Sequence, residues 1–321
     1  MVLFCFFNLT GLLKLLLLLL ISTVAGNVIG QNYYLSFKAA GISKNIDSVQ
    51  VTNINLKTTK TVLGNEILYL KDSTLQTIKQ KPADKNFSAI NPSSSIRELN
   101  FRKGDLIKLV GFSGQNKTVV MTIPENDEII SFWFEPCVDV DGNSYAIMKI
   151  GNQLWMVENL RTTRYRNGDT IPNTTNKYEW DTLKYGAYRN YYDDEKKVLK
   201  YGRLYNWYAV NDTRGLAPAG WRIPDVDDWT KMENTNVPGD KGNAIGSKLK
   251  ELALIPAGYC DPKSGFGSLG EEGFWWLSYD ESLQKAWYCY LNFRQSSVSL
   301  TTCDKHHGFS VRCVKDLPQN R

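Results

Sequence analysis

Tryptophan is concentrated in one part of this sequence, and that concentration limits the folds open to the chain. Nine tryptophans are present, and only Trp133 precedes Cys137. The other eight are Trp155, Trp180, Trp207, Trp221, Trp229, Trp275, Trp276 and Trp287. Indole rings bury large apolar areas, and a buried ring N–H usually finds a hydrogen-bond acceptor. We therefore place a domain boundary at about residue 136 and expect most of the later tryptophans to lie in a core.

The first thirty residues form an apolar leader. They contain one lysine, Lys14, no acidic residue, and a nearly continuous apolar run from Leu15 to Val24. Small residues follow this run, namely Ala25, Gly26 and Gly30. A short apolar core before small residues is typical of a secretory signal peptide. The sequence therefore predicts that residues 1–30 are removed and that the mature chain is exported, as a secreted, periplasmic or cell-surface protein.

An uncleaved N-terminal anchor is the alternative, because Met1 to Phe7 is also apolar. A helix that spans a membrane needs about 20 apolar residues, whereas Asn8 and Lys14 interrupt the longer stretch. No later stretch is apolar enough to span a bilayer, so we expect no membrane span after removal of the leader.

Residues 31–135 show the period-two alternation that is typical of β-strands. Tyr33, Leu35 and Phe37 alternate with polar or small residues, a pattern that buries one face of a strand and leaves the other in water. Turn-forming pairs such as Gly104-Asp105 separate the apolar runs. Several short strands at this spacing predict an antiparallel β-sandwich, which we interpret as a spacer or an adhesive domain.

Residues 137–316 mix short strands with a few short helices, and residues 317–321 form a short tail. The clearest helix start follows Pro224. Asp225 is suited to the N-cap position, and Asp228, three residues later, can accept a bond from the cap amide. The segments after this helix are strand-like and are joined by short polar loops, which predicts an antiparallel meander. The chain as a whole is therefore expected to be α+β and mostly β.

Charge and potential metal ligands exclude several functions. The net charge of +5 is spread along the chain without a basic block, which does not indicate nucleic-acid binding.

The mature chain has five cysteines but no C-x-x-C pair, and its only histidines, His306 and His307, are adjacent. Asp139 to Asn143 looks like half of a calcium loop, but the twelfth position is Ile150, which cannot coordinate calcium. The sequence thus predicts no metal site and no cofactor.

A series of short motifs runs through residues 137–316. The motifs are Asp139-Val-Asp-Gly-Asn-Ser-Tyr145, Lys149-Ile-Gly-Asn-Gln-Leu-Trp-Met-Val-Glu-Asn-Leu160, Tyr201-Gly-Arg-Leu-Tyr-Asn-Trp-Tyr-Ala-Val210, Gly220-Trp-Arg-Ile-Pro-Asp225, Asp228-Trp229, Trp275-Trp276, Ala286-Trp287-Tyr288 and Gly308-Phe-Ser-Val-Arg-Cys-Val314. In type and order they resemble the Fibrobacter succinogenes major paralogous domain family, and they cover over half of the chain.

This resemblance implies a fold and a location. The Trp-Arg-x-Pro and closing Gly-Phe motifs are similar to those of formylglycine-generating-enzyme-like domains, a variant of the C-type lectin fold. The C-terminal part is therefore expected to be a C-type-lectin-like domain. The family occurs mostly in exported proteins of Bacteroidetes-type bacteria, and it implies no catalytic residues. Structural roles are expected for Trp221, Pro224, Asp225, Asp228, Trp229, Gly308 and Phe309.

Two disulfides are candidates. Family members often have Cys-Pro-x-Gly-Trp where this chain has Ala217-Pro-Ala-Gly-Trp221, so Cys313 lacks its usual partner and Cys137 is the candidate substitute. A three-residue loop at 295–297 would place Cys289 opposite Cys303, where cross-strand distances suit a disulfide. A change of register by one residue removes this second pair.

Aromatic side chains are the candidate ligand-binding residues, because aromatic rings stack on the apolar faces of other molecules. Trp275 and Trp276 are adjacent, so on a strand they point to opposite faces. One is expected in the core and the other exposed or covered by a loop. An aromatic and acidic loop is the second candidate, with a solvated surface loop as the alternative. Its residues are Tyr191, Tyr192, Asp193 and Asp194.

These observations favour an exported, non-catalytic binding or adhesion protein whose partner is a carbohydrate or an envelope component. An enzyme of the formylglycine-generating type is one alternative, and it would need a reactive cysteine pair or a metal. The other alternative is a surface protein that associates only with copies of itself.

Overall fold

The computed structural model describes residues 32–73, 95–234, 255–294 and 297–318. The predicted leader lies outside these ranges. The described fold is mostly β, with several sheets and few short helices, as the sequence predicts. No helix in the described part of the chain is long and apolar enough to cross a membrane.

The first sheet has four strands in the order β5-β4-β1-β8. Their bounds are Tyr33–Gly41 for β1, Ile67–Asp72 for β4, Ile96–Phe101 for β5 and Glu128–Phe134 for β8. Strands β1 and β4 are antiparallel, but β4 pairs in parallel with β5, and β1 with β8. The prediction of a purely antiparallel arrangement is therefore wrong. Residues 73–95 separate β4 from β5, and residues 42–127 separate β1 from β8. Both stretches exceed the dozen or so residues that parallel pairing requires.

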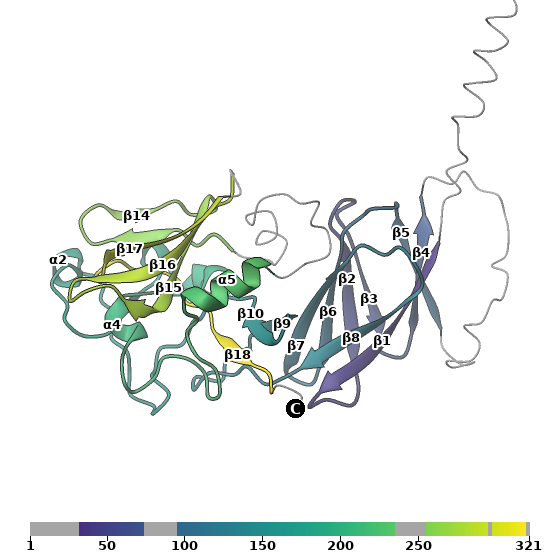
Figure 1. The fold of residues 1–321 in the computed structure, drawn as a ribbon, viewed down its shortest axis with the longest axis horizontal. Coiled ribbons are helices and arrows are strands. Elements are labelled where there is room, and N and C mark those ends of the chain that lie inside the picture. The colour runs from purple at the N-terminus through teal and green to yellow at the C-terminus, as the bar shows by residue number, and fades with distance from the viewer. Residues whose placement is uncertain (1–31, 74–94, 235–254, 295–296, 319–321) are drawn as a thin grey trace, which may run out of the picture.

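The second sheet has seven strands in the order β18-β10-β9-β7-β6-β2-β3 and runs through both parts of the chain (Figure 1). The strand bounds are Ser48–Asn53 (β2), Thr58–Leu63 (β3), Ile107–Ser113 (β6), Asn116–Thr122 (β7), Ala146–Ile150 (β9), Gln153–Met156 (β10) and Val314–Asp316 (β18). Strands β7 and β9 meet in parallel, with Thr118 opposite Ile147. The sheet thus crosses the boundary that we predict at residue 136.

Side chains of both sheets share one core in the N-terminal part. Leu35, Leu70 and Phe132 come from the first sheet, and Val51 and Leu109 come from the second. All five are fully buried. The period-two alternation therefore identifies the inward faces of these strands correctly.

The C-terminal part contains three further sheets. Strands β15 (Glu272–Asp280), β16 (Lys285–Asn292) and β17 (Ser297–Asp304) form an antiparallel meander. Two small hairpin-like pairs are β11 (Tyr188–Arg189) with β12 (Leu204–Tyr205), and β13 (Tyr259–Asp261) with β14 (Gly265–Gly267). The short helices are α2 (Lys177–Trp180), α3 (Val198–Tyr201), α4 (Trp207–Val210) and α5 (Val226–Asn234), with 3₁₀ turns η2 (Tyr191–Asp193) and η3 (Glu195–Lys197).

The tryptophans of the C-terminal part fill its core, as predicted. Seven of the eight are buried, and only Trp287 is half-buried. Trp155, Trp229 and Trp275 form a chain of rings, with centroids 5.4 and 6.1 Å apart. These rings pack between the second sheet, helix α5 and the meander.

Helix α5 begins with the reciprocal bonds that the sequence predicts. The Asp228 amide donates to Asp225 Oδ1 at 2.8 Å, and the Asp225 amide donates to Asp228 Oδ2 at 2.9 Å. This capping box satisfies two backbone donors that a helix start leaves open. It directs Trp229, which is fully buried, into the core.

The register of β16 and β17 contradicts one predicted disulfide. Cys289 lies opposite Leu300, and Cys303 lies opposite Ala286. The two cysteines are therefore three positions out of register, because Asn292 pairs with Ser297 and residues 295–297 do not form the predicted three-residue loop. The other candidate pair, Cys137 and Cys313, lies in one core cluster, but no described cysteine forms a disulfide.

Candidate functional site

Trp275 and Trp276, the first ligand candidates, are both buried. Their side chains point to opposite faces of β15, as predicted, and belong to different core clusters. The Trp275 ring nitrogen donates to Asn159 Oδ1 at 2.9 Å, and the Trp276 ring nitrogen donates to the Tyr205 carbonyl at 2.8 Å. Of the two expectations for the second ring, exposed or covered, exposure is wrong, because β15 is covered on both faces. Neither indole offers a surface to a ligand.

Asn159 is the centre of a buried polar network. Its Oδ1 accepts from Trp275 and from Arg312 Nε at 3.0 Å, and its Nδ2 donates to the Tyr201 carbonyl at 2.8 Å. Arg312 also donates to the Met156 carbonyl at 3.2 Å. Burial lowers the pKa of Arg312, and nearby Glu158 opposes this effect. The network joins segments far apart in the sequence, so its role is structural.

The remaining residues with predicted structural roles lie in or beside the core. The Trp221 ring nitrogen donates to the Pro136 carbonyl at 2.9 Å, and the Pro224 carbonyl accepts from the Ser278 amide at 2.9 Å. Phe309 packs on Trp276 with centroids 4.6 Å apart. A Cβ at Gly308 would lie 3.0 Å from Cys260 Cβ, so the close approach at this position favours glycine.

The second candidate, the loop around Tyr192, lies at the surface. Tyr191 is buried, Asp193 is exposed, and Asp194 is half-buried. The Tyr192 side chain is 62% exposed. Tyr192 and Asp193 both adopt left-handed backbone conformations, with φ of 55° and 54°. Such conformations cost free energy for residues other than glycine, so surrounding contacts must hold them.

Arg189 supplies those contacts. Its Nε and Nη2 donate to the two carboxylate oxygens of Asp193 at 3.1 and 2.6 Å. The Arg189 guanidinium lies over the Phe266 ring, 4.6 Å from its centroid, and the residue is 5% exposed. A bidentate pair of this kind fixes orientation as well as distance. The buried guanidinium of Arg189 thus holds the loop in its conformation.

Three aromatic rings form what we call the Tyr192 patch, consisting of Tyr191, Tyr192 and Phe266. The Tyr192 centroid lies 4.8 Å from that of Tyr191 and 5.4 Å from that of Phe266. Both contacts are edge-to-face. Asp194 ends the loop by capping η3, and its carboxylate accepts from Lys196 N at 3.0 Å. The patch therefore presents one exposed ring on two supporting rings.

A second aromatic surface was not predicted from the sequence. Tyr259, Tyr288 and Tyr290 are half-buried around the Phe274 ring, with centroids 5.0 to 6.0 Å from it. The Tyr290 hydroxyl donates to Glu272 Oε1 at 2.6 Å. Burial raises the pKa of Tyr288 to about 12. The alternation of Tyr288 and Tyr290 along β16 was the signal that could have identified this face.

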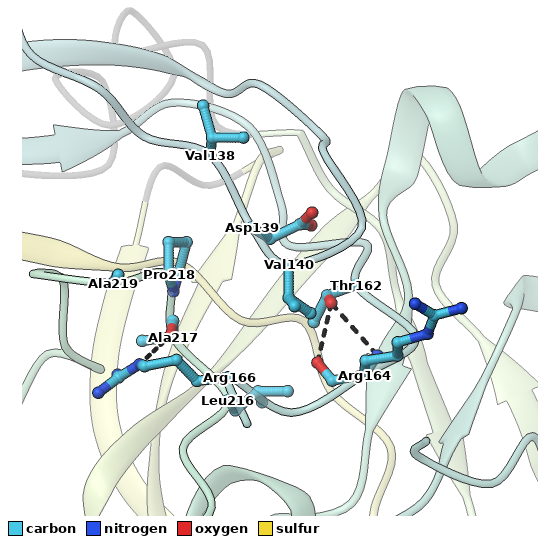
Figure 2. Close-up of a pocket in the computed structure, with 10 residues that line it drawn as sticks. All are labelled: Val138, Asp139, Val140, Thr162, Arg164, Arg166, Leu216, Ala217, Pro218 and Ala219. Atoms are coloured by element: carbon cyan, nitrogen blue, oxygen red, sulfur yellow. Dashed lines mark hydrogen bonds between the residues drawn. The ribbon is translucent and has the colours of Figure 1, made fainter. Parts of the chain in front are cut away.

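A pocket lies near the start of the C-terminal part (Figure 2). Its volume is about 220 Å³. Three segments line it, at residues 138–140, 162–166 and 216–219. Its walls are largely apolar, and Arg164 and Arg166 extend on opposite sides of it (Figure 2).

Burial disfavours the thiolate form of four described cysteines. Burial raises the pKa of Cys260 to about 11, although Arg189 opposes the shift. Burial likewise raises the pKa values of Cys137, Cys303 and Cys313. A protonated thiol is a poor nucleophile. Within the described ranges, no group of three or more His, Cys, Asp or Glu side chains is placed to hold a metal ion.

Comparison with known proteins gives one match. A family model described as the Fibrobacter succinogenes major domain matches residues 148–315. No curated protein and no solved structure matches the chain.

Proposed function

This chain belongs to the Fibrobacter succinogenes major domain family, and from that premise we propose that it is an exported, non-catalytic binding or adhesion protein. Its ligand is a carbohydrate or a cell-surface polymer. The N-terminal part acts as a β-sandwich spacer, and the C-terminal part is a C-type-lectin-like module that carries the ligand site.

The exposed ring of Tyr192 is the observation that carries this proposal. The ring is 62% exposed, yet its backbone is held at a φ of 55°. The left-handed conformation costs a tyrosine roughly 1–2 kcal/mol, so contacts around the loop must keep it in place. Strain that is kept by a buried ion pair is typical of functional loops. A pre-set aromatic ring stacks on a sugar face with little further loss of conformational entropy.

Polar groups beside the patch supply the rest of a sugar site. Asn190 Nδ2 donates to Glu195 Oε2 at 2.7 Å, and Arg203 donates to Glu195 Oε1 at 2.8 Å. Glu195 is largely exposed, with 68% of its side-chain surface accessible. Asn190 is itself buried, so the exposed Glu195 carboxylate is the group that would bond sugar hydroxyls while the ring contacts the C–H face.

The raised thiol pKa values argue against the formylglycine-generating alternative, which needs a reactive cysteine. We expect iodoacetamide at pH 8 to leave the cysteines of the native protein largely unmodified and to alkylate them after unfolding in urea. Rapid stoichiometric alkylation of one native thiol would favour the enzyme.

A glycan array combined with a pull-down of envelope material tests the proposal directly. We expect saturable binding to one class of polysaccharide or envelope polymer. Absence of binding above background in both assays would contradict the proposal. Light scattering across a range of concentrations addresses the self-associating alternative, because reversible assembly without any glycan binding would support that alternative instead.

Export is tested in the cells that naturally produce the protein. Cell fractionation with mass spectrometry of the mature N-terminus should place the protein outside the cytoplasm, with its first residue near residue 27 or 31. An intact leader on a cytoplasmic protein would contradict export.

A further inference from the structure

The pocket in Figure 2 lies between loops that the Tyr192 patch does not involve. Its apolar wall is made by Val138, Val140, Leu216, Ala217 and Pro218. Its volume is about 220 Å³. This space accommodates a short branched chain in contact with the apolar wall.

Arg166 gives the pocket a positive charge that forms no ion pair with the described residues. Its Nε donates to the Ala217 carbonyl at 3.1 Å, and its backbone amide donates to the Gly215 carbonyl at 2.7 Å. The guanidinium lies against Gly215, where an added Cβ would come within 3.3 Å of Cζ. These contacts fix the guanidinium but leave its terminal nitrogens available. None of the ion pairs found among the described residues includes Arg166.

The one carboxylate in the wall is already satisfied. Asp139 Oδ1 accepts from the amides of Asp141 and Asn143 at 3.0 and 2.9 Å. Its Oδ2 accepts from Asn143 Nδ2 at 2.8 Å and from the Tyr145 hydroxyl. The Asp139 carboxylate points away from Ala217 and Leu216 (Figure 2). It therefore holds the turn rather than competing for a cation in the pocket.

Arg164 adds a second, weaker positive charge on the opposite side. It pairs with Asp141 at 3.6 Å, and its side chain is 53% exposed. The Thr162 hydroxyl donates to the Arg164 carbonyl at 2.9 Å and accepts from the Arg164 amide at 3.3 Å, so these bonds hold residues 162–164 in place. The pocket thus combines an apolar wall with one guanidinium whose terminal nitrogens are available and one that is shared with Asp141.

We propose that this pocket binds a carboxylate that is carried on a short branched apolar group. Arg166 donates to the carboxylate oxygens, and Val140, Leu216 and Ala217 contact the apolar group. A single guanidinium matches a planar carboxylate in a bidentate geometry. A phosphate can also accept two bonds from one guanidinium, but it has no apolar group to contact the wall. The same chemistry occurs in a free branched-chain acid and in the C-terminal residue of a peptide.

Titration calorimetry of the full mature chain tests this assignment with four probes: isobutyrate, isobutyramide, N-acetylvaline and inorganic phosphate. We expect isobutyrate to bind at least about tenfold more tightly than isobutyramide, which corresponds to about 1.4 kcal/mol. Tighter binding of N-acetylvaline would identify a peptide C-terminus as the natural source, and tighter binding of isobutyrate would identify a free acid. Phosphate binding as tight as that of isobutyrate, or equal binding of the amide, would overturn the proposal.

Variants locate the site. Arg166→Gln should weaken isobutyrate binding at least about tenfold, and Arg166→Lys should give an intermediate loss because the charge stays but the fork geometry is removed. Ala219→Phe, at an exposed position on the rim, should block the pocket without disturbing the core. Arg102→Gln, an exposed arginine in the N-terminal part, is the matched control and should bind as the parent does.

Thermal unfolding of each variant shows whether it is folded. If Arg166→Gln and Ala219→Phe are folded and bind isobutyrate as the parent does, the pocket is not the site and the proposal fails. Glycan binding by the same variants reports on the Tyr192 patch separately, so either proposal can fail alone.

Discussion

Single polar residues hold the aromatic core of this protein together. Asn159 bonds five partners on four distant segments, and Asp228 bonds the start of its own helix, Arg222 and Gln153. Buried polar groups cost free energy unless they are paired. A core of large rings cannot supply such partners by itself. These two side chains therefore determine which of several packings of the rings is stable.

Asn159→Ala tests the first of these residues. The change leaves the Trp275 ring nitrogen and Arg312 Nε without their acceptor in a buried place, and each orphaned group costs about 1–3 kcal/mol. We expect the free energy of unfolding to fall by about 2–4 kcal/mol in urea titrations. Asn167→Ala removes an amide from an exposed turn and should cost under about 1 kcal/mol. Equal losses in the two variants would contradict the structural role of the network.

Asp228→Asn tests the role of the second polar residue, Asp228. Burial alone would raise the pKa of Asp228, but hydrogen bonds from Arg222, the Asp225 amide and Gln153 outweigh it and lower the pKa from 3.8 to about 2. A lowered pKa stabilises the folded state above the unfolded pKa, and this contribution fades as the pH falls through the folded value. The variant should lose roughly 2 kcal/mol at pH 7.

The same variant should differ little from the parent at pH 2, where the parent carboxyl is also becoming protonated. Asp227→Asn, an exposed change in the same helical turn, is the control and should be nearly neutral at both pH values. Urea unfolding at the two pH values provides the measurement. A loss that is as large at pH 2 as at pH 7 would show that the carboxylate charge is not the cause.

At the scale of elements, the loop that carries Tyr192 depends on contacts from outside itself. Arg189 lies on β11, and Phe266 lies on β14. Together they hold two residues in left-handed conformations. The rigid strands thus position a surface ring that the loop alone would not keep in place.

Asp193→Ala should release this loop. The change leaves the buried Arg189 without its carboxylate, and the loss of one partner from a largely buried pair costs about 1–3 kcal/mol. We expect faster hydrogen exchange of the amides at 191–194. Asp193→Asn keeps the tolerance for a positive φ but lacks the charge, so it should show a smaller increase. Unchanged exchange in both variants would mean that Arg189 does not hold the loop.

Local chemistry could be predicted from the sequence, whereas pairing between distant strands could not. The capping box of Asp225 and Asp228 depends on residues three apart, and it was predicted correctly. The pairing of Cys289 with Cys303 depended on the length of one turn, and a shift in register was enough to make it wrong. The side-chain alternation at Trp275 and Trp276 was correct, but burial on both faces depends on segments that only the tertiary structure brings together.

Only part of the candidate site could be predicted, because contacts between distant segments leave no local sequence pattern. Tyr192 was among the candidate residues because aromatic and acidic residues are adjacent in the sequence. The support from Arg189 and Phe266 comes from separate strands and left no local pattern. The pocket beside Arg166 likewise joins three segments, of which only the turn at Asp139 to Asn143 was recognised.

At the scale of the whole molecule, one sheet and one core cluster connect the two parts of the chain. Strand β7 pairs with β9, and Val119 lies in the same cluster as Met148 and Trp155. Lys315 pairs with Glu135 across the same junction. The N-terminal part is thus bound to the scaffold that carries Tyr192.

Val119→Ala tests this coupling. Removal of two buried methyl groups costs about 1–3 kcal/mol, and we expect the loss to appear in tryptophan fluorescence, since eight of the nine tryptophans lie in the C-terminal part. Val62→Ala, which is buried in the N-terminal core alone, should shift the same signal if the chain unfolds as one unit. A tryptophan transition that neither change moves would show that the two parts unfold independently.

The central claim is that a rigid aromatic scaffold presents Tyr192 to a ligand. A depletion isotherm on the polysaccharide that scores highest in the glycan array tests it most directly, with the parent, Tyr192→Ala and Tyr178→Ala compared. Tyr178 is 85% exposed on α2 and serves as the matched control. Tyr192→Ala should weaken binding about tenfold or more, as expected for a central aromatic anchor, while Tyr178→Ala should bind as the parent does. Equal affinities for all three proteins would contradict the account.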